Sequence, residues 1–155
     1  MNPDEVIKMM DSRRALFGLF LAFGNRLQAV GDSFYDEITC KQFFLMACMN
    51  LFTEEPPTAN ELAETMGCSR QNVKEILTSL ERKGYIEFVT DSADRRKKRI
   101  VMTETAEKMK QKYFGKEVEF ISGLYDGISD EDIAHTYRVI SDIEKNLMKM
   151  KEKLS

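Results

Sequence analysis

Two adjacent helix-capping patterns constrain this chain more than any other feature. Thr58 and Glu61 have the spacing of a capping box, in which each side chain accepts a hydrogen bond from the other residue's backbone N–H. Gly67 can end that short helix in a left-handed conformation, and Ser69 can cap a second, longer helix that ends at Gly84. A short and a long helix joined by about three residues form a helix-turn-helix. The sequence therefore predicts this motif at residues 58–84.

The hydrophobic period changes from helical to alternating after Gly84. Residues 85–90 alternate and are rich in β-formers, and residues 99–102 can pair with them across a polar segment. A hairpin directly after a helix-turn-helix is a wing. The predicted fold class is therefore mostly α with a small β-hairpin wing (α+β).

Two helices are predicted before this motif. The first is one continuous helix that spans roughly residues 3–30. The second begins at Cys40, after an N-cap at Thr39, and runs to Phe52. Because it is apolar on nearly every side, we expect it to be a central, buried helix.

Two more helices are predicted after the wing. Thr103 caps one that reaches roughly Gly123, and the acidic residues at 130–132 open the last one after Ser129. Along the last helix, apolar residues recur at alternating spacings of three and four: Ile140, Ile143, Leu147, Met150 and Leu154. Such a coiled-coil-like seam has to be buried, and a second copy of the chain is the economical candidate.

The charge of the chain is unevenly distributed. The whole chain has a net charge of −3, but residues 69–103 hold nine Lys and Arg against five acids, which leaves −7 for the remainder. A basic segment inside an acidic chain is the distribution expected of a local polyanion site.

The second helix of a helix-turn-helix enters the major groove of DNA, and its N-terminal residues meet the base edges. Arginine can pair with guanine, and Gln or Asn with adenine. The predicted DNA-binding residues on this helix are Ser69, Arg70, Gln71, Asn72, Lys74 and Thr78.

The predicted wing tip carries five consecutive cations, residues 95–99, after Asp94. A basic ribbon can enter the minor groove, whose negative potential favours arginine. We expect the Asp94 carboxylate to hold the guanidinium of Arg96 in one geometry. The predicted DNA-binding residues of the wing are Asp94, Arg95, Arg96, Lys97 and Lys98.

Several blocks together resemble the MarR family of winged-helix transcriptional regulators. They are ITCKQ at residues 38–42, TANELA at 58–63, SRQNV at 69–73, LERKGYI at 80–86, and the run from DSADRR at 91–96 to MTE at 102–104. The main blocks cover about fifty residues, and their order and spacing match the family.

The resemblance implies a homodimer held by the first, fifth and sixth helices, which binds a pseudo-palindromic operator in double-stranded DNA and usually represses. It also implies that Arg96 is the minor-groove arginine, with Asp94 as its orienting partner. The expected dimer interface adds Leu16 and Phe20 to the seam of the last helix. We expect three regions within one structural domain: residues 1–37 and 104–155 for dimerisation, and 38–103 for DNA binding. In such families a small aromatic or amphipathic effector most often relieves DNA binding.

Other classes of protein fit less well. His135 is the single histidine, and no phosphate loop or nucleophile elbow is present, so we expect no enzyme, catalytic residue, metal site or cofactor. The longest nearly apolar run, residues 15–24, is too short to cross a bilayer, and the stretch before it is neutral. We therefore expect a cytoplasmic protein without a membrane partner.

Two alternatives remain open. One is a thiol-based redox sensor that uses Cys40, Cys48 or Cys68. Cys40 lies at a helix start, where the helix dipole can lower the pKa of its thiol, although inert apolar cysteines are favoured. The other is a winged helix used only for protein contacts, which would not need five wing-tip cations.

Overall fold

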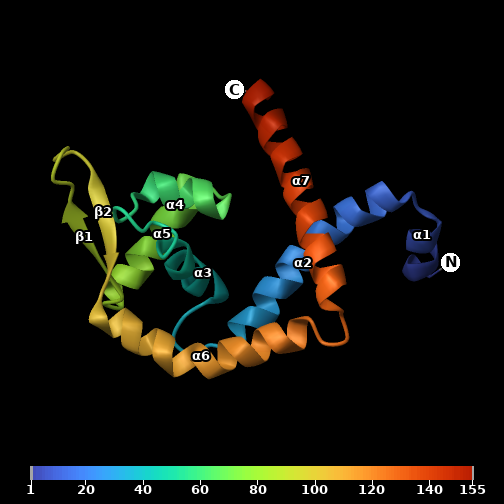
Figure 1. The fold of residues 1–155 in the computed structure, drawn as a ribbon, viewed down its shortest axis with the longest axis horizontal. Helices are drawn as coiled ribbons and strands as arrows, with labels where there is room; N and C mark the ends of the chain where they lie inside the picture. Colours follow the sequence, from blue (N-terminus) through green and yellow to red (C-terminus); the bar gives the residue numbers. More distant parts are fainter. Residues whose placement is uncertain (1, 155) are drawn as a thin grey trace. The chain divides into compact units, whose positions relative to one another are not determined.

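The computed structural model describes residues 2–154. Over this range the chain is mostly helical with one antiparallel hairpin, as the sequence predicts (Figure 1). In chain order the elements are α1 (Pro3–Met9), α2 (Ser12–Asp32), α3 (Cys40–Met49), α4 (Ala59–Met66), α5 (Arg70–Arg82), β1 (Ile86–Thr90), β2 (Lys98–Met102), α6 (Glu104–Leu124) and α7 (Asp130–Leu154). They form two compact units, Met1–Lys116 and Glu117–Ser155.

The prediction of a single helix over residues 3–30 is wrong, because the helix is interrupted at Asp11. Asp11 has a non-helical backbone with a ψ of 132°, and its carboxylate accepts hydrogen bonds from the backbone N–H groups of Arg13 at 3.2 Å and Arg14 at 3.4 Å. A short acidic side chain that satisfies these N–H groups starts a new helix and does not continue the old one. Helix α1 therefore ends at Met9, and α2 begins at Ser12.

Helix α3 begins as predicted after Thr39 but ends earlier, at Met49. Gln42 completes a capping box with Thr39, with both reciprocal hydrogen bonds at 3.1 Å. Phe44 is 48% exposed, so the helix is not buried on every side. Its buried face packs on α4 and α5, and the opposite side remains open to solvent.

The helix-turn-helix forms as predicted from α4 and α5. The Thr58 hydroxyl accepts from the Glu61 backbone N–H, and the Glu61 carboxylate accepts from the Thr58 backbone N–H at 2.7 Å. Gly67 ends α4 with a φ of +65°, a conformation that glycine adopts without steric cost. The inward face of α5 joins α3 and α4 in one apolar core, whose fully buried members include Leu45, Leu62, Val73, Leu77 and Leu80.

The wing packs against the start of α4. Strands β1 and β2 pair antiparallel, from Ile86 opposite Met102 to Thr90 opposite Lys98. The other edge of β2 is also occupied, because the Ile100 backbone N–H donates to the Pro57 carbonyl at 2.8 Å. The base of the wing is therefore tied to the segment that leads into α4.

The two long helices after the wing differ in burial. Thr103 caps α6, and α6 contributes Ala106, Met109 and Tyr113 to the core of the first unit. Ser129 caps α7, where no described residue is buried. The predicted seam is thus open in the single chain: Leu147 is 58% exposed and Met150 is 60% exposed.

Candidate nucleic-acid interface

The start of α5 presents polar side chains to solvent. Ser69 caps the helix by accepting a hydrogen bond from the Asn72 backbone N–H at 3.2 Å. The side-chain amide of Gln71 donates to Glu75 one turn later at 3.0 Å. The structure leaves all six residues that the sequence marks on this helix exposed: Ser69, Arg70, Gln71, Asn72, Lys74 and Thr78.

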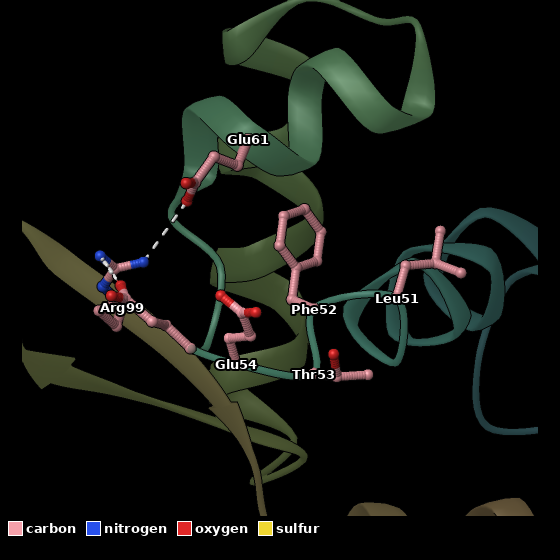
Figure 2. A pocket seen from close by; sticks show the side chains of 7 residues that line it. Leu51, Phe52, Thr53, Glu54, Glu61 and Arg99 are labelled. Carbon is pink, nitrogen blue, oxygen red and sulfur yellow. Dashed lines mark ion pairs between the residues drawn. The ribbon is translucent and has the colours of Figure 1, made fainter.

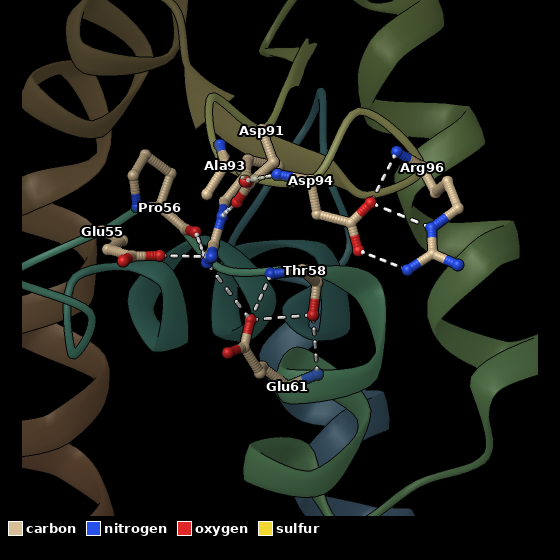
Figure 3. A network of polar contacts seen from close by, with 9 residues as sticks. Glu55, Pro56, Thr58, Glu61, Asp91, Ala93, Asp94 and Arg96 are labelled. Atoms are coloured by element: carbon tan, nitrogen blue, oxygen red, sulfur yellow. Dashed lines mark hydrogen bonds and ion pairs between the residues drawn. The ribbon is translucent and has the colours of Figure 1, made fainter.

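The structure also brings Asp94 and Arg96 together at the wing tip (Figure 3). Oδ1 of Asp94 accepts from the backbone N–H and from Nε of Arg96, both at 3.0 Å, and Oδ2 accepts from Nη2 at 3.1 Å. The Arg96 side chain is nevertheless 91% exposed. These hydrogen bonds lower the pKa of Asp94 and raise that of Arg96, so both groups stay charged. The guanidinium is therefore oriented and open to a partner.

The expectation of five cations at the wing tip is wrong, because Arg99 turns toward the helix-turn-helix. Its side chain is only 14% exposed and forms ion pairs with Glu55, Glu61 and Asp91. Arg95, Arg96, Lys97 and Lys98 remain exposed. The acceptors of Arg99 come largely from residues about forty positions upstream, so the local sequence pattern carries no signal for its position.

Asp91 organises the base of the wing loop. Its Oδ1 accepts from the backbone N–H groups of Ala93 at 2.8 Å and Asp94 at 2.7 Å, and its Oδ2 accepts from Nε of Arg99 at 2.6 Å. These bonds, with the Asp94 N–H foremost, lower the pKa of Asp91 to about 2. The loop that carries Arg96 is therefore internally held before any ligand is bound. By sequence, Arg99 is one of the five wing-tip cations, and no role is expected for Asp91.

A hollow of about 480 Å³ lies beside this network (Figure 2). Leu51 and Phe52 supply its apolar side, and Glu54, Glu55 and Glu61 supply carboxylates. Arg99 also lines it, where its guanidinium faces Glu61. Because acids outnumber cations here, the hollow repels phosphate and does not extend the basic surface of the wing tip.

A second polar cluster joins α6 to the base of the wing. The Tyr85 hydroxyl donates to Glu37 at 3.0 Å, and Lys112 of α6 forms an ion pair with the same carboxylate. The hydrogen bonds from Lys112 and Tyr85 lower the pKa of Glu37. Glu37 therefore connects the loop before α3 to both the wing and α6.

The surroundings of two of the cysteines, Cys40 and Cys48, disfavour their thiolate forms. Burial raises the pKa of Cys40, and the nearby Asp32 raises it further, which opposes the lowering expected at a helix start. Burial also raises the pKa of Cys48. No group of three or more His, Cys, Asp or Glu among residues 2–154 is arranged to hold a metal ion. Within the same range, no helix is long and apolar enough to cross a bilayer.

The fold matches solved structures over most of the chain. A DNA complex of MepR from S. aureus aligns with a TM-score of 0.73 at 21% identity, covering 83% of this chain and 95% of that one. A MarR/EmrR family regulator from Acinetobacter sp. ADP1 aligns at 0.79 with 15% identity, covering 90% and 99%. FabT from Streptococcus pneumoniae in complex with DNA aligns at 0.62 with 22% identity, also covering 90% and 99%.

Because these identities are only 15–22%, the solved structures establish the winged-helix fold and nothing finer. The sequence itself matches the model of the MarR family over residues 38–98, from just before α3 to the first residue of β2. That segment contains the helix-turn-helix, the wing tip and the Asp94–Arg96 pair. Residues 38–98 therefore match the MarR family in sequence and share the winged-helix fold of the solved structures.

Proposed function

We propose that this chain is a transcriptional repressor that binds a specific, pseudo-palindromic site in duplex DNA as a homodimer. The observation that carries the proposal is the Arg96 side chain, which three hydrogen bonds to Asp94 orient although it is 91% exposed. Holding a long, exposed side chain in one geometry costs conformational entropy, and the protein gains no core packing in return. A fixed, open guanidinium at the tip of a hairpin suits the narrow minor groove of DNA.

The exposed start of α5 supports the same function. Its Arg, Gln and Asn side chains can hydrogen-bond to guanine and adenine in the major groove, while Lys74 can reach a phosphate. The wing and α5 belong to the same compact unit, so one duplex can meet both. Base contacts from α5 would then supply most of the sequence preference, and the wing cations would add affinity.

A homodimer accounts for the apolar side chains that the single chain leaves open. The proposed interface contains Leu16 and Phe20 of α2 and Ile140, Ile143, Leu147, Met150 and Leu154 of α7. A two-fold axis would bury the same stripe on both copies. It would also place two copies of α5 about 34 Å apart, which matches successive major grooves on one side of a duplex.

Relief of DNA binding by a small amphipathic or aromatic effector completes the proposal. A hollow of about 710 Å³ on the first unit supports it, with Ile7, Met10 and Leu19 among its apolar lining residues. Its charged lining residues are Lys8, Arg14 and Arg26, a set without acids. This lining favours an apolar molecule that carries a negative charge.

Selection of bound fragments from random duplex DNA tests the proposal directly. We expect an enriched pair of inverted half-sites whose centres are about one helical turn apart. Affinity for the selected site should fall by about 10³ or more between 50 and 200 mM salt, because several phosphates are neutralised. A flat salt response, or equal affinity for all sequences, would overturn the proposal of a specific repressor.

A further inference from the structure

Arg99 is a wing cation by sequence, but its contacts lie on the helix-turn-helix side of the wing. Its Nη1 donates to the Pro56 carbonyl at 2.9 Å, and its Nε donates to Asp91 at 2.6 Å. It also forms ion pairs with Glu55 and Glu61 (Figures 2 and 3). With 14% of its side chain exposed, Arg99 has little surface left for a phosphate.

The contacts continue from Arg99 to the wing tip without a gap. Asp91 holds Arg99 through one carboxylate oxygen and the backbone N–H groups of Ala93 and Asp94 through the other. Asp94 then holds the guanidinium of Arg96. A chain of charge-assisted hydrogen bonds therefore links Arg99 to the side chain proposed to enter the minor groove.

At its other end, the chain of contacts reaches the first residues of the helix-turn-helix. The Glu61 carboxylate that pairs with Arg99 also accepts from the backbone N–H and the hydroxyl of Thr58, the N-cap of α4. The backbone of Arg99 lies beside Thr58 in an isolated antiparallel bridge. Arg99 therefore contacts α4 through both its side chain and its main chain.

We infer that Arg99 is a positioning residue for DNA binding, which contacts no DNA and holds the wing loop at a set place relative to α4 and α5. This inference rests on the proposed function. A wing and a recognition helix that must meet the same duplex bind more tightly when their spacing is set before binding. Acceptors on three different segments also require the planar, five-donor guanidinium, which the single ammonium of lysine cannot replace.

Hydrogen exchange in the DNA-free protein tests the contacts themselves. Arg99→Lys keeps the charge but loses the fork of donors, and Arg99→Gln removes the charge as well. In both variants we expect the amides of Ala93 and Asp94 to exchange about tenfold faster, because Asp91 loses its partner. Amides in the middle of α5, such as that of Leu77, should keep their protection and serve as the control for folding.

A double-mutant cycle on the selected DNA site separates positioning from direct contact. Arg99→Lys should weaken binding about tenfold in the wild-type background. It should weaken binding by the same factor in the Arg70→Ala background, which serves as the control because Arg70 lies on α5. In the Arg96→Ala background, Arg99→Lys should weaken binding by less than about twofold, because the side chain that Arg99 positions is already absent. In Arg99→Gln, which removes the charge, the dependence of affinity on salt should not change, whereas loss of a phosphate contact would lower the slope by about 0.9 for each subunit.

The outcomes distinguish this inference from the function on which it rests. Unchanged exchange at Ala93 and Asp94 would overturn the role of Arg99 whether or not the protein binds DNA. Full additivity with Arg96→Ala, or a lower salt slope in Arg99→Gln, would overturn the positioning role of Arg99. A wild-type chain that binds no duplex would overturn the proposed function, while the exchange measurement would still report on the Arg99 contacts.

Discussion

Asp94→Asn should weaken operator binding, although it removes a negative charge from the DNA-facing side of the protein. The Asp94 carboxylate accepts three hydrogen bonds from Arg96, and an amide cannot accept all of them with the strength of a carboxylate. The released guanidinium, already 91% exposed, would then sample many rotamers, and binding in the minor groove would cost the entropy of restricting it to one of them.

The size of the effect follows from the proposed symmetry. We expect about a threefold loss for each released arginine, and two wings on one operator multiply this to about tenfold. Arg96→Ala, which removes the minor-groove contact itself, should cost more, about 10- to 100-fold. Fluorescence anisotropy with a labelled operator at constant salt measures both values.

Asp142→Asn is the matched control. Asp142 also forms an exposed ion pair, with Lys145 at 2.8 Å, but it lies in α7 and is not among the proposed DNA contacts. Its replacement changes the net charge by the same amount and should leave affinity within about twofold of wild type. If Asp94→Asn binds more tightly than Asp142→Asn, the wing acts through charge alone, and the orienting role of Asp94 is refuted.

Leu147→Glu, at a side chain 58% exposed in the single chain, should abolish both the dimer in light scattering and operator affinity, because a symmetric interface would bury two unpaired carboxylates; a dimer with normal affinity contradicts the interface. Leu80→Ala, at a fully buried side chain, should lower the free energy of unfolding by about 2–5 kcal/mol in urea titration, and a loss under about 1 kcal/mol would argue against this core. The pKa of Asp91, lowered to about 2 in the folded protein, means that its stabilising contribution is complete above about pH 4 and is lost as the pH falls through 2. Urea titrations should therefore show a lower free energy of unfolding for Asp91→Asn than for wild type at pH 6, and this difference should shrink toward pH 2. A difference independent of pH would contradict the stabilising role of the Asp91 carboxylate.

Much of the helix-turn-helix could be predicted because its signals are local. The capping box of Thr58 and Glu61, the left-handed Gly67 and the cap at Ser69 act over three or four residues, so the sequence specifies them without reference to the rest of the fold. The hairpin register follows from alternation of the same local kind. The Asp11 cap is also local, but it competes with a long apolar helical pattern, and the structure shows that the cap prevails.

Only the tertiary structure decided which charged residues face outward. Arg96 and Arg99 are three positions apart in one basic run, yet one is 91% exposed and the other 14%. The difference arises because folding brings Glu55 and Glu61 beside Arg99 and leaves Arg96 with Asp94 alone. Since the strength of an ion pair depends on distances between segments remote in the chain, a run of cations in the sequence cannot distinguish a side chain that holds the wing from one that is free to meet DNA.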